Sequence, residues 1–499
     1  MKKLSLLLAC AIILGGAGIV SASAKDEIVV NAVSEPATLD PHLQWDPSSY
    51  YVYRNIFDNL VTRSDEGEIV PQVALRWDQV SDTEMVFEIR DDIRFHDGEV
   101  LGPDDVVFSI KRITDPELGS PQLGQFNKIA NAEVLDDGRV KVTTKGPYPA
   151  LLAQLVKLSI VPEHVVTAVG DDEFNAAPVG SGPYVFDEWV RGVEVRLVRN
   201  DNYWGDRGFF ESAVFRAVPD AATRVANLRA GAADLVMALN TDLAMQLGGG
   251  SRGKILAVNT ERVAYFAMNL ARPPLDDADL RQAISFAINR HAIVDGLLGG
   301  YPRVVDQLLS PAHFGWSEGI QGVEYNPEKA REIVAKLGDA AKTEMAIATS
   351  PIFDQRIVQA IQQMLNDVGL NVSIETTDMS TWLQGQQSTS GQAPMLTFSR
   401  WSCTCQDADG IMFPLLHSDS NWSRVSDPEV DAMLDKAREE LDPEVRLELY
   451  ADVNRTILEN VAIVPLYQTA ILYGAADELE WTPTSNESMF LNRMSWSSQ

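Results

Sequence analysis

Basic residues, histidine and cysteine are scarce in this chain of 499 residues, and each shortage argues against certain classes of function. Lysine and arginine together number 41, against 71 aspartates and glutamates, which gives a formal net charge of −30 at pH 7. An acidic surface repels phosphate backbones, so we expect no nucleic-acid partner. The same charge serves solubility and therefore does not identify a ligand class.

Apolar runs long enough to cross a bilayer are missing after the first residues. The chain opens with Lys2 and Lys3, continues through an apolar run over residues 4–20, and reaches a small-x-small sequence that ends at Ala24. This pattern is typical of a cleavable secretory signal peptide, which we place at residues 1–24. The alternative is a lipoprotein signal that ends before Cys10, but cleavage there would leave an apolar run in the mature protein. We expect an exported protein.

Three cysteines are present, and Cys10 leaves with the signal peptide. The other two, Cys403 and Cys405, lie in the stretch "SRWSCTCQDADGIMF". A structural zinc site normally takes four nitrogen or sulfur ligands, and the six histidines show no paired ligand spacing, so we expect no metal. Residues two apart can reach bridging distance, which favours a local disulfide in an oxidising compartment. Two free, buried thiols are the alternative, and the sequence does not separate the two states.

Catalytic constellations are missing as well. No serine stands in a Gly-x-Ser-x-Gly elbow, no His-Glu-x-x-His occurs, and the glycines of "GSGPY" at Gly180–Tyr184 lack the spacing of a phosphate loop. Asp407 and Asp409 lie two residues apart on one predicted loop, so they cannot readily flank a scissile bond. We therefore predict that the protein is not an enzyme and needs no cofactor.

The chain does contain a mixture of helix and strand patterns. An amphipathic helix is predicted at residues 50–61 and a β-hairpin at residues 184–198. Helix followed by strand over residues 357–374 is typical of α/β proteins. Asp-Pro pairs at 427–428 and 442–443 each supply an N-cap and a first-turn proline for a helix. The fold class we expect is α/β with at least two lobes, because about 475 mature residues exceed what one core supports.

Several segments occur in the same order as the motifs of one known family. They are "EPATLDPH" (Glu35–His42), "IFDNLV" (Ile56–Val61), "IRFHDGEVLGPDDVVFSIKR" (Ile93–Arg112), "GSGPY" (Gly180–Tyr184), "NDNYW" (Asn200–Trp204), "AMNLARPPLDDADLRQAISFAINR" (Ala267–Arg290), the loop with Trp401, and residues 427–457. The ordered set covers almost the whole mature chain. On these motifs the chain resembles the family 5 extracellular solute-binding proteins of ATP-binding-cassette (ABC) importers, the group of the oligopeptide, dipeptide and nickel receptors.

The resemblance implies a two-lobed periplasmic binding protein fold, a clamp with a hinge, and an additional β-rich subdomain. Lobe I would take residues 25–54, 179–262 and 471–499, the subdomain residues 55–178, and lobe II residues 263–470. Two chain crossings, near Arg262 and Ala470, would form the hinge. Ligand contacts on both lobes would then favour a closed state.

The resemblance also implies a function, that of a monomeric periplasmic receptor of a peptide-class ABC transporter. Such a receptor captures a small-molecule ligand between its lobes and delivers it to the transmembrane permease subunits. Two ligand classes stay open, namely peptides held through their backbone and neutral oligosaccharides or glycosides stacked on Trp401. Alternatives of other classes are a secreted hydrolase and a redox or metal sensor built on Cys403 and Cys405.

In this family the loop with the tryptophan lines the ligand cleft, and an indole offers a large, rigid contact face. The alternative for this tryptophan is an ordinary place in a core. The expected ligand contacts are Trp401, Ser402, Cys403, Thr404 and Asp407 in lobe II, and Trp45, Tyr50 and Tyr265 near lobe I. In relatives, the acids that match Asp407 and Asp409 more often brace the loop than touch the ligand.

Two departures from the family pattern concern the ligand. Dipeptide and oligopeptide receptors that this chain resembles carry an aspartate three residues after the tryptophan, where it pairs with the ligand's α-amino group, and here Thr404 stands there. Dipeptide receptors also tend to carry an arginine before a proline, for the ligand carboxylate, where this chain reads Ser350-Pro351. An unpaired buried ion costs on the order of several kcal/mol. We therefore predict a pocket that is not specialised for short peptides.

Overall fold

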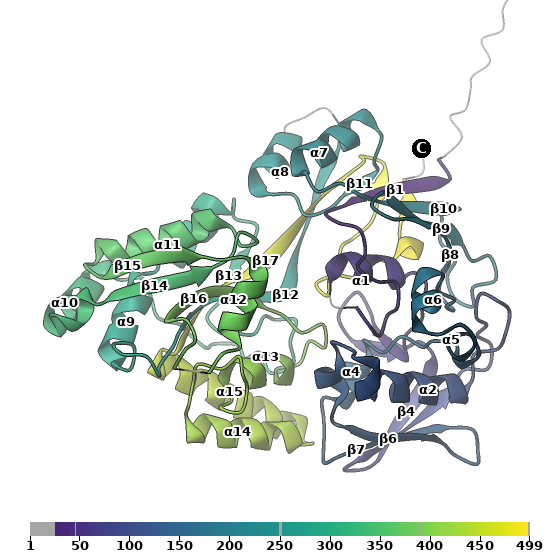
Figure 1. The fold of residues 1–499 in the computed structure, drawn as a ribbon, viewed down its shortest axis with the longest axis horizontal. Helices are drawn as coiled ribbons and strands as arrows, with labels where there is room; N and C mark the ends of the chain where they lie inside the picture. The colour runs from purple at the N-terminus through teal and green to yellow at the C-terminus, as the bar shows by residue number, and fades with distance from the viewer. Residues whose placement is uncertain (1–24, 45, 249–251, 390, 498–499) are drawn as a thin grey trace, which may run out of the picture.

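A large mixed sheet runs through both lobes of the protein (Figure 1). The structure is a computed structural model that describes residues 25–44, 46–248, 252–389 and 391–497, so the predicted signal peptide lies outside the described residues. In spatial order the strands are β15 (Asn371–Thr376), β14 (Glu344–Thr349), β16 (Leu396–Trp401), β12 (Lys254–Met268), β17 (Ile463–Ala475), β11 (Leu235–Val236), β1 (Glu27–Ala32), β10 (Ser212–Ala217), β9 (Glu194–Arg199) and β8 (Tyr184–Val190), with β13 (Arg303–Val304) beside β17.

Lobe I is built around β1, whose sequence EIVVNA is rich in β-branched residues and almost entirely buried. β1 pairs in parallel with β10 and β11, and β8 and β9 form the predicted hairpin at residues 184–198, which is thereby confirmed. The other elements of this lobe are α1 (Pro47–Tyr53), α7 (Ala221–Ala230), α8 (Thr241–Gly248), β18 (Leu479–Glu480), η4 (Leu491–Arg493) and β19 (Ser495–Trp496).

The subdomain carries its own four-stranded antiparallel sheet, in the order β4 (Ala74–Ser81), β5 (Glu84–Ile89), β7 (Val140–Thr144) and β6 (Ile129–Val134). Helix α2 (Pro103–Thr114) buries Val106, Ile110 and Ile113 in the core of this sheet. The remaining elements are β2 (Val61–Arg63), β3 (Ile69–Pro71), η1 (Pro116–Leu118), α3 (Leu123–Phe126), α4 (Leu151–Leu155), α5 (Glu163–Val169) and α6 (Asp171–Ala176).

The last two of these helices belong to the lobe I core rather than to the subdomain sheet. Val166 of α5 and Phe174 of α6 are buried in the same apolar cluster as β1, and Phe174 contacts Phe57 with ring centroids 6.0 Å apart. The subdomain and lobe I therefore share one continuous core at this point.

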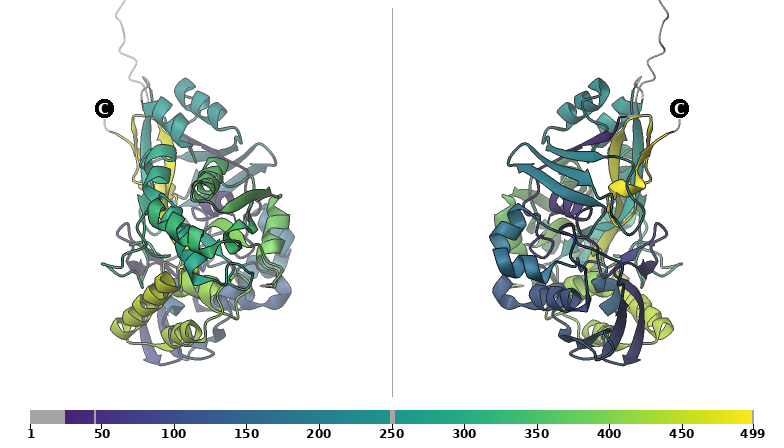
Figure 2. Two further views of the ribbon diagram at one scale, coloured as in Figure 1. Left: turned by 90° about the vertical axis from the view of Figure 1, so that its left-hand side faces the viewer. Right: turned by 90° about the vertical axis from the view of Figure 1, so that its right-hand side faces the viewer.

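Lobe II contains an α/β layer and a helical layer, each with its own core. β14 pairs in parallel with both β15 and β16. When lobe II faces the viewer, helices lie in front of the sheet (Figure 2, left). The helices are α9 (Ala278–Ala287), η2 (Ala292–Leu297), α10 (Pro327–Leu337), η3 (Ala340–Lys342), α11 (Gln355–Asp367), α12 (Met379–Gln386), α13 (Asp409–Leu416), α14 (Pro428–Glu439) and α15 (Pro443–Asn460). None of the helices in the described ranges is long and apolar enough to cross a membrane.

Several elements of lobe II were predicted from sequence and are confirmed. α11 followed by β15 matches the helix-then-strand pattern of residues 357–374. Asp427 accepts from the N–H of Glu429 at the start of α14, and Asp442 accepts from the N–H of Glu444 at the start of α15. Each acid satisfies a helix-terminal N–H that would otherwise lack a partner, and the proline that follows already has the helical φ angle.

Strands β12 and β17 pass between the lobes and carry a break in their ladder. Pairing runs from Lys254 opposite Ala475 to Asn259 opposite Ala470, and resumes with Val263 opposite Gln468. Side chains bridge the gap, since the Gln468 amide donates to the Thr260 carbonyl at 2.8 Å. Residues 260–262 therefore form a bulge at the predicted lobe crossing.

The predicted helix at residues 50–61 is shorter than expected. α1 ends at Tyr53, and the following carbonyls bind the GSGPY segment instead of continuing the helix: Asn55 O accepts from Tyr184 N at 2.9 Å and Ile56 O from Gly182 N at 2.8 Å. The contact is close, because a Cβ on Gly180 would lie 2.0 Å from Ile56 O. A partner more than 120 residues away in sequence thus ends the helix, which local periodicity could not indicate.

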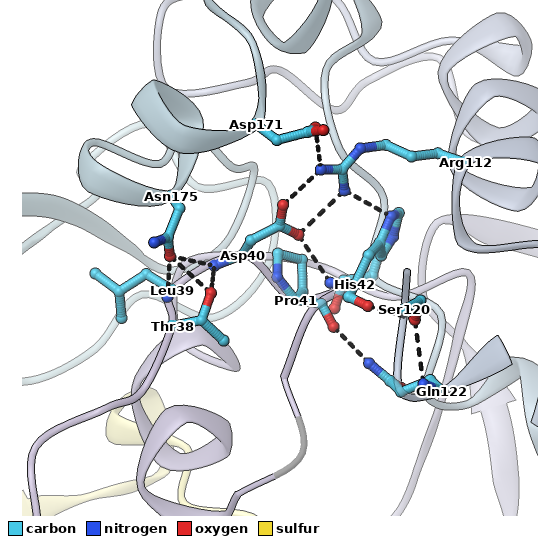
Figure 3. Close-up of polar contacts among 11 residues, drawn as sticks. Thr38, Leu39, Asp40, Pro41, His42, Arg112, Ser120, Gln122, Asp171 and Asn175 are labelled. Carbon is cyan, nitrogen blue, oxygen red and sulfur yellow. Dashed lines mark hydrogen bonds and ion pairs between the residues drawn. The ribbon is translucent and has the colours of Figure 1, made fainter. Parts of the chain in front are cut away.

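The TLDPH segment has a structural role, shown in Figure 3. The Arg112 guanidinium of α2 binds both carboxylate oxygens of Asp40, at 2.5 and 3.1 Å, and also Asp171 at 2.6 Å and His42 Nδ1 at 3.1 Å. Because Arg112 occupies Nδ1, the proton of His42 lies on Nε2 and is donated to Ser159 O at 2.9 Å. Burial lowers the pKa of His42 to about 4, so it stays neutral. This network fixes the start of the loop that leads to α1.

Candidate ligand-binding site between the lobes

The loop around Trp401, residues 399–409, lies at the lobe junction. β16 ends at Trp401, which pairs with Val263 of β12 at the first rung after the break in the β12–β17 ladder. The chain then runs over residues 402–408 into α13. Because β12 crosses between the lobes at this point, its pairing with β16 brings the loop to the junction.

Trp401 is partly buried and is held at two points. Its Nε1–H donates to Gly410 O at 2.9 Å, and its ring meets the ring of Trp422 edge-to-face, with centroids 5.1 Å apart. The single donor of the indole is therefore used inside the loop. What the side chain offers to a ligand is ring surface rather than a hydrogen bond.

The two acids of the loop are buried and brace it. Arg446 of α15 donates to both oxygens of Asp407 at 2.7 Å, and Asp407 also accepts from the N–H of Asp409 at 2.9 Å. Asp409 forms an ion pair with Arg438 of α14 at 2.7 Å. Asp407 is 3% exposed and both of its carboxylate oxygens bind Arg446, so the structure gives it a bracing role, and its contact with ligand stays a prediction. The bracing role that the resemblance implies fits both acids.

The structure places a disulfide between Cys403 and Cys405, with Cα atoms 5.0 Å apart. Gly410 packs against this bridge, since a Cβ there would lie 2.4 Å from Cys403 Sγ. Within the described residues, no group of three or more His, Cys, Asp and Glu side chains could hold a metal ion. The bridge and Gly410 together set the path of the loop.

The loop contacts lobe I and the subdomain as well as lobe II. Arg63 of β2 donates to Cys405 O, and Gln406 donates to Ser485 Oγ at 3.2 Å. Tyr148, in the subdomain, donates to Asp409 Oδ2 at 3.3 Å. A single loop thus touches all three parts of the protein.

The other predicted contacts divide into partly exposed and buried side chains. Ser402 and Thr404 are partly exposed, and so is Tyr50, whose hydroxyl lies 2.9 Å from Ser488 Oγ. Cys403 and Tyr265 lie in the core of the helical layer of lobe II, and burial raises the pKa of Tyr265 to about 12. Direct ligand contact stays a prediction for these two, with little of either side chain exposed in this structure. Trp45 lies outside the described residues.

Charged residues at the junction were missed from sequence. Arg400, on β16 beside Trp401, is exposed, with its guanidinium 5.6 Å from the centre of the Phe353 ring.

Arg262, in the bulge of β12, contacts Glu487 at 3.4 Å. Arg54 is 4% exposed and its guanidinium lies over the rings of Tyr50 and Phe490. The sequence did offer one signal for Arg400, namely a basic residue directly before Trp401 in a strongly acidic chain.

Glu261 occupies the centre of the bulge and is 1% exposed. Neither carboxylate oxygen has a hydrogen-bond partner among the described residues. Burial, and next the neighbouring Glu487 carboxylate, raise the pKa of Glu261 to about 8, against the opposing effect of Arg262. Glu261 is therefore mostly protonated and neutral at pH 7.

A separate hollow of about 440 Å³ lies on lobe II and is lined by Arg272, Glu344, Trp382 and Met395 among others. All of its lining residues come from lobe II. A ligand bound there would contact lobe II alone. It would therefore not shift an equilibrium between open and closed forms. The junction around Trp401 is the better candidate.

Comparisons with known proteins agree with this fold. The model of the bacterial extracellular solute-binding proteins, family 5 (middle region), matches residues 68–423. The glutathione-binding protein GsiB of Salmonella typhi is 27% identical over 464 residues, which cover 89% of each chain.

Solved structures show the same two-lobed fold. The ABC transporter substrate binding protein CtaP of Listeria monocytogenes superposes with a TM-score of 0.87 at 21% identity, over 95% of this chain and 100% of that chain. The periplasmic binding protein DppA of Helicobacter pylori, solved with the peptide STSA, superposes with a TM-score of 0.81 at 22% identity, over 95% and 99%. Because the family model matches residues 68–423, well over half of the chain, the protein belongs to the family 5 bacterial extracellular solute-binding proteins.

Proposed function

We propose that the protein is the periplasmic receptor of a peptide-class ABC importer and that it holds its solute against the Trp401 loop. The observation that carries this proposal is the position of the loop, which contacts lobe I, lobe II and the subdomain beside the bulge of β12. A solute bound there touches elements on both sides of the crossing strands. Its binding energy therefore favours a closed arrangement of the lobes.

The closed form is then what the permease recognises, and the receptor acts by binding rather than by chemistry. The relatives are solute-binding proteins, which supports this reading over a secreted hydrolase. Two bodies would move, lobe II (residues 263–470) and lobe I together with the subdomain, because α5 and α6 belong to the lobe I core. Export by the signal peptide at residues 1–24 and a monomeric state are part of the proposal.

The solute is peptide-like. The relatives described above carry glutathione and a peptide in their names, and they give no support to the neutral-sugar alternative. The ring face of Trp401 suits a side chain or a flat peptide unit. Thr404 offers no charge to an α-amino group, so recognition of the amino terminus is weak.

Thermal unfolding with peptides and small-angle X-ray scattering test the proposal. A ligand at roughly 100 times its Kd stabilises the folded state by about 2.7 kcal/mol, and the radius of gyration should fall as the lobes close. Glutathione and the tetrapeptide Ser-Thr-Ser-Ala are the first probes. A ligand that raises Tm without changing the radius of gyration would contradict closure.

Substitution of the tryptophan locates the site. Trp401→Ala should remove the ligand-induced shift in Tm, because the main contact face is lost. Trp189→Ala is the matched control, since Trp189 lies on β8 at the far edge of the large sheet. An unchanged shift in Trp401→Ala would place the ligand elsewhere.

A further inference from the structure

Arg400 is a solvent-exposed arginine at the lobe junction whose guanidinium has no polar partner among the described residues. Among the buried arginines, Arg224 binds Met237 O at 3.0 Å and Arg281 binds Leu275 O at 2.9 Å, whereas Nε and Nη1 of Arg54 lack a hydrogen-bond partner among the described residues, as the guanidinium of Arg400 does. Within the described residues, Arg400 has neither a hydrogen-bond acceptor nor a carboxylate within 4.0 Å. In a chain with 71 acidic residues, an unpaired arginine at the lobe junction calls for a specific explanation.

The nearby carboxylates already have partners of their own. Glu487 is bound by Arg262, at 3.4 Å. Asp354, at the start of α11, is bound by Arg356 at 2.7 Å, and Arg356 also meets Asp242 of lobe I at 3.4 Å. Glu261 is mostly neutral because it is buried. None of these acids is free to neutralise Arg400.

The position of Arg400 also favours a ligand. It precedes Trp401 on β16, at the carboxyl end of strands that run parallel to one another in lobe II. Crevices outside the carboxyl ends of such strands are the usual ligand sites of α/β sheets. Surrounding protein and the nearby Arg262 lower the pKa of Arg400, although the side chain is still exposed. The guanidinium of Arg400 is therefore close to surrounding protein and still open to solvent.

We propose that Arg400 binds an anionic group of the solute, a carboxylate above all, so that the receptor selects acidic peptide-like ligands. The inference rests on the proposed function and names the substrate class. A guanidinium presents two parallel N–H donors that match a carboxylate, and such charge-assisted pairs are among the stronger hydrogen bonds. The contact with Phe353 holds the guanidinium without using these donors.

The rival explanation is an ion pair within the protein, in which Arg400 joins Glu487 when the lobes close. Electrostatic influence of Glu487 on Arg400 is present already. In that case Arg400 would stabilise closure with any ligand, acidic or neutral. The two explanations differ in whether the ligand's charge matters.

The experiment compares ligands that differ only in charge. Mature protein is incubated with glutathione, with Ser-Thr-Ser-Ala and with a small-molecule filtrate of yeast extract, each before and after methyl esterification. Bound species are read by native mass spectrometry, and Kd is measured by calorimetry for those that bind. The variants are Arg400→Gln and Arg400→Lys, with Arg331→Gln on the outer helix α10 as the control.

We expect wild-type protein to bind acids and not their esters. Arg400→Gln should weaken binding roughly 30-fold or more, the size seen when one partner of a buried charge pair is removed. Arg400→Lys should keep part of the affinity and Arg331→Gln all of it. The unliganded Tm of each variant checks that it folds.

Three outcomes would overturn the inference. Equal binding of acid and ester by wild-type protein would mean that the ligand's charge is not read. An equal loss of affinity for acid and ester in Arg400→Gln would favour the ion pair with Glu487. Capture of no solute by wild-type protein would remove the proposed function and this inference with it, whereas capture that is unaffected by Arg400→Gln would remove this inference alone.

Discussion

Glu261 makes the stability of the protein depend on pH in a direction opposite to that of most acids. Its folded-state pKa is about 8, against an ordinary value of 4.5. Between these values the folded chain holds a proton that the unfolded chain has released. The free energy of unfolding therefore falls as pH rises through this window, by about 1.4 kcal/mol per pH unit. Below pH 4.5 the contribution is complete, and above pH 8 it is lost.

The perturbation that isolates this group is Glu261→Gln, which keeps the shape of the side chain and removes its titration. The difference in unfolding free energy between wild type and variant should change by roughly 4 kcal/mol from about pH 5 to about pH 8, with the variant the more stable at the alkaline end. Urea denaturation at several pH values measures this difference. The groups that face Glu261 are Glu487, Arg262 and Arg63, and they are unchanged in the variant.

The control is Glu480→Gln, at an exposed acid on β18, which should leave the pH dependence as in wild type. Using the difference between proteins removes the contribution of all other titrating groups. Parallel curves for wild type and Glu261→Gln would refute the reasoning. Such curves would mean that the Glu261 carboxylate is ionised in the folded state and is stabilised there by a partner or by water.

Further predictions concern the loop. Asp407→Asn should lower the free energy of unfolding by about 3–5 kcal/mol, because Arg446 is left buried without a counter-charge. The control is Asp419→Asn, at an exposed acid, which should change this free energy by less than about 0.5 kcal/mol. Urea denaturation measures both variants. Gly410→Ala should cost about 1–3 kcal/mol in the same assay, since its methyl group meets the disulfide. Thiol counting in denaturant should find no free thiol in the mature protein, and full reactivity of Cys403 and Cys405 would refute the bridge.

The sequence predicted what local patterns can encode. Capped helices α14 and α15, the hairpin of β8 and β9, and the α/β pairing of α11 with β15 follow from periodicity, turn residues and N-caps. The end of α1 did not follow, because its hydrogen bonds go to Gly182 and Tyr184, and contacts over such separations leave no local trace. The same limit applies to the core shared by α5, α6 and β1.

The candidate site was predicted in part for the same reason. The Trp401 loop came from a family resemblance, and the structure places it at the lobe junction. The family resemblance made Asp407 an expected ligand contact, and only its pairing with Arg446, 39 residues later, shows that the carboxylate is bound inside the protein. Arg400 was overlooked because strand alternation gives the face of a side chain but not what lies opposite. That no acid within the described ranges pairs with it is visible only in three dimensions.

The shared core of lobe I and the subdomain limits how the molecule can move. Three compact parts joined freely would need several independent rotations to enclose a solute. Because Val166 and Phe174 pack in the core of lobe I, we expect two rigid bodies, linked by β12 and β17 at the gap in their ladder. We expect closure to follow essentially one coordinate, a bend at residues 260–262. With a single bend, we expect solutes of different sizes to meet the same pair of walls, and larger solutes to stop closure at a smaller angle.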